Sequence, residues 1–92
     1  MHFYIVIQPD PGGVEIWGCG STIKQCMELV QPWRDDLSIE ELTAGERGIG
    51  ETVAYSKKDC WVPPQRFPAR SGHHTWKWEL TALGKERTCE ST

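Results

Sequence analysis

The sequence predicts an α+β domain: a small antiparallel β-sheet of four to six strands with one amphipathic α-helix packed on a face, in the order ββαβββ(β). Three observations predict this class. The chain has 92 residues, which suffices for a single domain (1–92) with one modest core. Its nine Gly and six Pro separate short segments that are rich in β-branched and aromatic residues. Apolar residues at helical spacing occur in one segment, so we expect one helix on the sheet.

The N-terminal segment predicts a β-hairpin. Residues 2–8 are rich in strand-forming side chains, and Pro9-Asp10-Pro11-Gly12-Gly13 is a strong turn signal. The strand pattern resumes at residues 14–17, where Val14 and Ile16 share one face of the expected strand.

A helix is predicted next, with Ser21 as its N-cap. It ends at about Val30 or Gln31, because Pro32 disfavours the helical conformation in the residue before it. The apolar stripe that would lie on the sheet consists of Ile23, Cys26, Met27, Val30 and Trp33.

Residues 35–44 admit two interpretations. Their apolar side chains alternate as on a strand, whereas Ser38 and Glu41 have the spacing of a capping box for a short helix. We favour the strand, because residues 49–55 form a good strand pattern closely behind it. The intervening residues 45–48 suit a hairpin loop or a helix stop.

The next stretch predicts a turn, a short strand and a loop. Lys57-Lys58-Asp59 predicts a tight turn, after which Cys60-Trp61-Val62 is expected to form a short strand paired with the preceding one. Residues 63–74 contain three prolines and a glycine, which predicts a long Pro-rich loop. Ordered loops of this length in small domains frequently carry function.

The C-terminal part predicts one more strand and then a tail. Residues 75–80 alternate, with Trp76 and Trp78 on one face and Lys77 on the other. The pattern alone leaves open whether the two tryptophans belong to the core or to an interface. Residues 84–92 are polar, so we expect a flexible tail there.

The net charge of −3 divides unevenly along the chain. Residues 1–53 hold three Lys and Arg against nine Asp and Glu, a net charge of −6. Residues 54–92 hold seven Lys and Arg against four Asp and Glu, a net charge of +3. Such a separation governs encounter and orientation with charged partners, so it favours a domain that works by docking.

Catalytic and metal-binding motifs are weak. Cys19 lies between two glycines before the predicted helix, with His73 or His74 as a conceivable base, but a strand-to-helix turn explains the same residues. Cys60, His73, His74 and Cys89 are zinc-ligand types that lack the spacing of a zinc site. We therefore expect no enzyme activity, no cofactor and no bound metal.

Export and membrane insertion are not predicted either. The first apolar run, residues 3–7, is too short for a signal-peptide core or a membrane span, and no basic residue precedes it. We expect a cytoplasmic protein whose four cysteines are reduced.

Two sets of residues are candidates for partner binding. Basic and aromatic residues interleave in the C-terminal half, a mixture that suits phosphate contacts with base stacking and equally suits a protein interface. This basic and aromatic set consists of Lys57, Lys58, Trp61, Arg66, Phe67, Arg70, His73, His74 and Lys77. The acidic docking set consists of Asp35, Asp36, Glu40 and Glu41.

Several stretches of the chain resemble a known group of proteins. They are the strand Tyr4-Ile5-Val6-Ile7, the helix over 22–30, and the strand Glu51-Thr52-Val53-Ala54-Tyr55 followed by Cys60-Trp61-Val62. In size and pattern the chain is similar to the small phage-encoded anti-CRISPR proteins that act on type I-F surveillance complexes.

The resemblance implies a non-enzymatic inhibitor in the bacterial cytosol, without a small-molecule substrate. It would bind a CRISPR-Cas surveillance complex stoichiometrically and block target DNA binding or hybridisation. The acidic set would meet Lys and Arg of the Cas proteins, and Arg66, Arg70 and Lys77 would contact the guide RNA. The alternative is a small nucleic-acid-binding regulator from a phage or mobile element.

Overall fold

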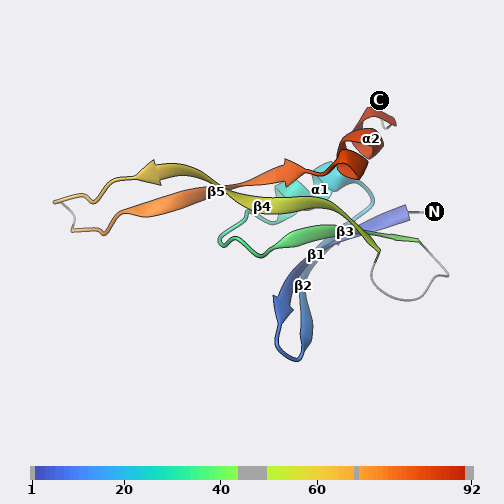
Figure 1. The fold of residues 1–92 in the computed structure, drawn as a ribbon, viewed down its shortest axis with the longest axis horizontal. Helices are drawn as coiled ribbons and strands as arrows, with labels where there is room; N and C mark the ends of the chain where they lie inside the picture. The colour runs from blue at the N-terminus through green and yellow to red at the C-terminus, as the bar shows by residue number, and fades with distance from the viewer. Residues whose placement is uncertain (1, 44–49, 68, 91–92) are drawn as a thin grey trace.

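The computed structural model describes residues 2–43, 50–67 and 69–90, and it confirms the α+β class with one helix more than predicted. A five-stranded antiparallel sheet has the strand order β2-β1-β3-β4-β5 (Figure 1). The elements in chain order are β1 (His2–Asp10), β2 (Gly13–Gly20), α1 (Ile23–Leu29), β3 (Ser38–Thr43), β4 (Glu51–Val62), β5 (His73–Leu80) and α2 (Ala82–Glu90).

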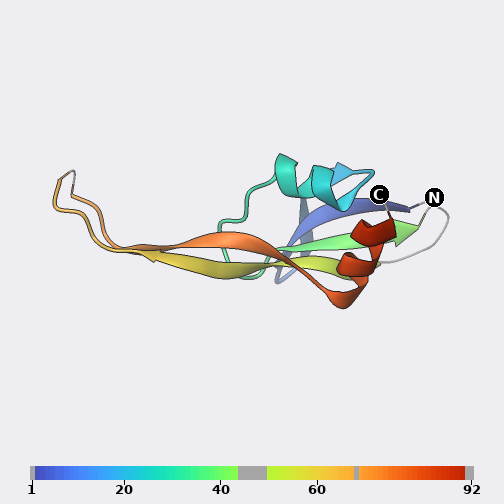
Figure 2. The same ribbon diagram turned by 90° about the horizontal axis from the view of Figure 1, so that it is seen from above.

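Helix α1 lies on one face of the sheet and encloses the core there (Figure 2). Its N-cap is Thr22, whose hydroxyl accepts a hydrogen bond from the Gln25 N–H, so the prediction of Ser21 was wrong by one residue. Ser21 instead donates its N–H and its hydroxyl to the Gln25 side-chain oxygen. The buried residues of the core are Tyr4, Val6, Ile23, Cys26, Ile39, Val53 and Ala54.

The predicted helical stripe is correct up to the helix end but not beyond it. Helix α1 ends at Leu29 with Val30 as its C-cap, close to the predicted end. Trp33 lies outside the helix and stays 43% exposed. Its ring packs edge-on against Trp17 of β2, with ring centroids 4.9 Å apart.

The ambiguous segment after the helix is a strand, as favoured from its alternation. Strand β3 pairs with β1 on one side and with β4 on the other, so it lies in the middle of the sheet. Residues 44–49, which include the predicted loop or helix stop at 45–48, lie outside the described residues.

The predicted turn at 57–59 and the separate strand at 60–62 are both wrong. Strand β4 runs without reversal through both segments and pairs with β5 from Ala54 to Val62, with one irregularity between Lys58 and Trp61. The three residues taken as a turn contain neither Gly nor Pro, which favour chain reversal. The loop is correspondingly shorter than predicted, because β5 begins at His73.

The predicted flexible tail is wrong for residues 84–90, which belong to α2, while residues 91–92 lie outside the described residues. The Thr81 hydroxyl accepts the Gly84 N–H at 3.1 Å and donates to the Thr52 carbonyl at 2.8 Å, tying the helix start to β4. A Cβ on Gly84 would lie 1.9 Å from the Val53 carbonyl oxygen. Only glycine permits so close a packing of helix on strand.

A buried carboxylate connects α2 to the middle of the sheet. Glu41 on β3 is 8% exposed and accepts hydrogen bonds from the Tyr4 hydroxyl at 3.2 Å and from Arg87 Nε at 2.7 Å. Burial alone would raise the pKa of Glu41, but the hydrogen bonds from Arg87 and Tyr4 outweigh it and hold the pKa below its ordinary value.

The lowered pKa of Glu41 makes folding stability pH-dependent with a definite sign. Stability from Glu41 is fully present above the carboxyl pKa of the unfolded chain and is lost as the pH falls through the lower, folded pKa. Glu41→Gln is expected to reduce the free energy of unfolding at pH 7 by about 1–3 kcal/mol. It should also flatten the loss of stability between about pH 5 and pH 3.

Urea unfolding monitored by tryptophan fluorescence across this pH range measures the effect. Glu15→Gln on the exposed edge strand β2 is the matched control, and it should retain the native pH profile. A parallel pH profile for Glu41→Gln and the unchanged protein would contradict the assignment.

Candidate functional site

The distal parts of β4 and β5 leave the sheet together as a two-stranded arm (Figures 1 and 2). We define the arm as residues 57–77; none of its described residues is buried. The molecule is correspondingly elongated, at 53 × 36 × 19 Å. Its radius of gyration is 15.3 Å, whereas a compact domain of this length has about 12 Å.

An extra residue on β4 bends the pairing of the arm. Lys58 lies opposite Trp76, but the next pair is Trp61 with His74, so β4 advances three residues while β5 advances two. The Thr75 hydroxyl satisfies the backbone there, accepting the Cys60 N–H at 3.0 Å and donating to the Cys60 carbonyl at 3.3 Å. The segment that reads as a turn in the sequence is therefore a β-bulge.

One face of the arm is aromatic. Side chains alternate along a strand, so His74 and Trp76 share a face, and Trp61 joins them because it lies opposite His74. We call Trp61, His74 and Trp76 the aromatic face. The same row continues into the body at Trp78, which packs against the core and donates its indole N–H to the Val30 carbonyl at 2.9 Å. Trp78 thus belongs to the core, and Trp76 to the arm.

The Trp61 ring is held in one orientation while 54% of the residue remains exposed. Its centroid lies 4.9 Å from that of His74, with the planes at 59°. A Cβ on Gly72 would lie 2.3 Å from Trp61 Cζ2, so the indole lies directly against the Gly72 backbone. This close approach accounts for glycine at position 72.

The tip of the arm is a short closed loop. Gln65 and Arg70 exchange two backbone hydrogen bonds of 2.9 and 3.0 Å, which closes the chain ahead of β5. Phe67 is 97% exposed at this tip, and Arg66 and Arg70 are also exposed.

The fold converts the charge split of the sequence into a split between arm and body. Residues 57–77 hold five Lys and Arg and one acidic residue, Asp59, which gives the arm a net charge of +4. The remaining residues hold five Lys and Arg and twelve Asp and Glu, a net charge of −7. Lys77 lies 3.9 Å from Asp59 and directly opposite Lys57 on the paired strand. All nine residues of the predicted basic and aromatic set lie in the arm.

The predicted acidic docking set does not form a surface patch. Glu40 is 5% exposed and accepts hydrogen bonds from the Thr52 and Ser38 hydroxyls, while Glu41 is bound by Arg87 and Tyr4. Both glutamates are therefore buried and hydrogen-bonded within the sheet, where β3 lies between β1 and β4. Of the other two members, Asp36 pairs with Arg34 and Asp35 is exposed.

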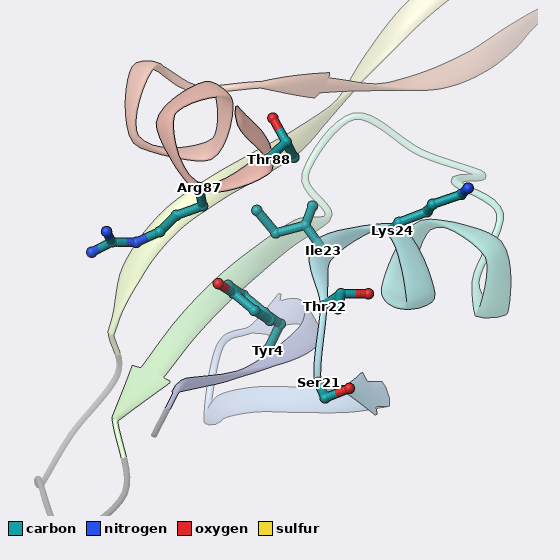
Figure 3. Close-up of a pocket in the computed structure, with 7 residues that line it drawn as sticks. All are labelled: Tyr4, Ser21, Thr22, Ile23, Lys24, Arg87 and Thr88. Carbon is teal, nitrogen blue, oxygen red and sulfur yellow. The ribbon is translucent and has the colours of Figure 1, made fainter. Parts of the chain in front are cut away.

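Among the described residues outside the arm, an open hollow of about 510 Å³ is lined by Cys19, Gln25, Glu28 and Leu29, and a smaller pocket lies between α1, α2 and β1 (Figure 3). The volume of the smaller pocket is about 110 Å³, below the 300 Å³ or more typical of small-molecule sites. The guanidinium of Arg87, which lines this pocket, forms an ion pair with Glu41. The pocket is lined by Tyr4, Ser21, Thr22, Ile23, Lys24, Arg87 and Thr88.

Of the cysteine and histidine candidates, Cys60, His73 and His74 lie in the arm, whereas Cys19 lies on β2. Cys26 is buried in the core, and burial, aided by Cys19, raises the pKa of its thiol to about 11, which suits a structural residue. His73 and His74 are consecutive on β5 and so face opposite sides of the arm. The part of the chain that the structure describes contains no group of three or more potential metal ligands.

The arm is expected to open independently of the core, since its backbone is held by its own pairing. Thr75→Val removes both hydroxyl hydrogen bonds to Cys60 and should accelerate amide hydrogen exchange at Cys60 and its neighbours in the arm. Global stability should fall by less than about 1 kcal/mol. Ser71→Ala, which removes an exposed hydroxyl of the arm, is the control. Equal acceleration in β1 and β3 would show that arm and core open together.

Neither helix in the described ranges is long and apolar enough to cross a membrane. Comparison of the chain with protein-family models, with curated proteins and with solved structures found no match.

Proposed function

We propose that the protein binds nucleic acid through its arm. The observation that carries the proposal is the concentration of five of the ten Lys and Arg on a projecting β-ribbon that contains one acidic residue. Cations on such a ribbon reach phosphates that a flat protein face would hold at a distance, and phosphate contacts supply most of the affinity in non-specific nucleic-acid binding.

Two cations lie opposite one another within the arm, and this arrangement favours binding of an anionic partner. Lys57 and Lys77 are directly opposite one another across β4 and β5, and like charges in this position destabilise a sheet. Asp59, 3.9 Å from Lys77, offsets part of this repulsion. A phosphate beside the two lysines would offset the rest, so binding would be coupled to stabilisation of the ribbon.

The acidic body explains how a chain with a net charge of −3 can bind a polyanion at one place. A body of net charge −7 repels phosphates, which confines contact to the arm. Four or five phosphate contacts correspond to a slope of about −3 to −4 when the logarithm of the association constant is plotted against the logarithm of salt concentration.

A second proposal is stoichiometric inhibition of a bacterial CRISPR-Cas surveillance complex in the cytosol. The resemblance of the sequence to anti-CRISPR proteins supports it, as does the opposite charge of arm and body. A partner that presents both basic protein and guide RNA would complement the two parts. Its acidic contact would involve the exposed Asp35 and the body charge in place of Glu40 and Glu41.

Neutralising the opposed lysines tests the main proposal. The double variant Lys57→Ala/Lys77→Ala is expected to bind labelled oligonucleotides about tenfold more weakly. It should also reduce the magnitude of the salt slope by about 2, because two phosphate contacts are lost. Fluorescence anisotropy between roughly 50 and 200 mM salt measures both quantities. Lys24→Ala/Lys85→Ala removes two exposed cations from the body and should leave both unchanged.

Two outcomes would redirect the assignment. If the unchanged protein binds neither single-stranded nor duplex oligonucleotides at low salt, the main proposal is wrong. Retention of Cas proteins on the immobilised protein from a bacterial host that expresses a surveillance complex would then support the inhibitor, and their absence would count against it.

A further inference from the structure

We infer that the nucleic acid bound by the arm is single-stranded, with an unpaired base stacked on Trp61 at the aromatic face. This inference rests on the proposed function and adds the class of substrate.

The Trp61 ring has the properties of a prepared stacking platform. The Gly72 backbone and the His74 ring support it from the arm, while 54% of the residue stays exposed. A flexible side chain would lose rotational freedom on stacking, whereas this ring is already oriented. Base stacking on such rings is tolerant of sequence, because every base has a π-face.

Cations bracket the ring along the length of the arm. Lys58 lies opposite Trp76, on the same face and closer to the body, and Arg70 lies beyond Trp61 at the tip. A strand that runs along the arm would therefore place phosphates on both sides of the stacked base. This alternation of aromatic and basic groups is the arrangement that single-strand grooves use.

A duplex would leave this arrangement unused. Paired bases are stacked on one another, so their π-faces are closed to a ring on the side of the ribbon. A duplex could use the exposed Phe67 at the tip as a wedge between base steps, but Trp61 would then gain nothing from the contact. The position of the prepared ring, on a face of the arm and away from its tip, therefore favours an unpaired strand.

The body provides a matched aromatic control. Trp17 is 48% exposed, close to the value for Trp61, and its indole N–H is held by Gln8 at 3.0 Å. Its ring already packs edge-on against Trp33, and it belongs to the acidic body. A general effect of losing an exposed tryptophan would therefore appear in Trp17→Leu, and a specific stacking role would not.

The test compares labelled single strands of about 12 nucleotides with hairpin duplexes of matched length, by fluorescence anisotropy. The unchanged protein is expected to bind the single strand at least about tenfold more tightly. Trp61→Leu should remove that preference without altering the duplex affinity or the salt slope. Trp61→Phe should restore most of it, and Trp17→Leu should not change it.

Gly72→Ala supplies a second variant that keeps every functional side chain. An added Cβ would overlap the indole at 2.3 Å and must displace it, so the loss of single-strand affinity should approach that of Trp61→Leu. Thermal unfolding of each variant checks that the body is intact, which is expected because none of the described arm residues is buried.

The outcomes separate the inference from the function on which it rests. Duplex binding as tight as single-strand binding, with Trp61→Leu without effect, overturns the single-strand inference and leaves phosphate binding by the arm in place. Absence of binding to both probes overturns the proposed function itself. Loss of single-strand binding in Trp17→Leu equal to that in Trp61→Leu also overturns the inference.

Discussion

Strand β4 imposes the constraint on which the rest of the structure depends, because one continuous strand serves both the core and the arm. Its first half contributes the fully buried Val53 and Ala54, and its second half contains no buried residue. The transition occurs at Ser56, whose N–H donates to the Leu37 carbonyl at 3.0 Å and whose hydroxyl accepts the Leu37 N–H at 3.1 Å. These hydrogen bonds fix the strand at the point where it leaves the body, and therefore set the direction of the arm.

This division has an energetic consequence. A two-stranded ribbon in water is marginally stable by itself, so the arm depends on being the continuation of two strands that are already paired in the sheet. Trp78 stabilises the base of the arm, where β5 joins the body, because it packs on the core and donates a hydrogen bond to the Val30 carbonyl. Further out, the hydrogen bonds of Thr75 with Cys60 and the contact between the Trp61 and His74 rings hold the ribbon in shape.

Local patterns in the sequence predicted most of the elements, and the larger errors occur where a partner distant in the chain decides the structure. The hairpin of β1 and β2, helix α1 and strand β3 follow from alternation, turn residues and helical spacing. Helix α2 lacks such a signal, because its attachment is a close approach of Gly84 to β4 and a bond from Arg87 to Glu41. Both contacts join segments that the sequence does not place together.

The candidate functional residues also depend on contacts between distant segments, which local sequence patterns do not predict. The basic and aromatic set could be identified from composition, but its assembly into one arm required the pairing of β4 with β5. The burial of Glu40 and Glu41 depends on the central position of β3, and strand order is not encoded in any local pattern. Gly72 carries no functional signature of its own, and its role is apparent only once the indole is seen against it.

The extra residue in β4 also determines which side of the ribbon Trp61 occupies. Alternation would place residues 58 and 61, an odd number of positions apart, on opposite faces, and the bulge reverses this parity so that both lie on one face. Deleting one residue at position 59 or 60 would leave two steps on β4 opposite two on β5, so it would abolish the bulge and keep the indole opposite His74. Regular pairing of the full-length strand without the bulge would instead put the indole on the other side of the ribbon, away from His74 and Trp76, so the bulge is itself part of the site.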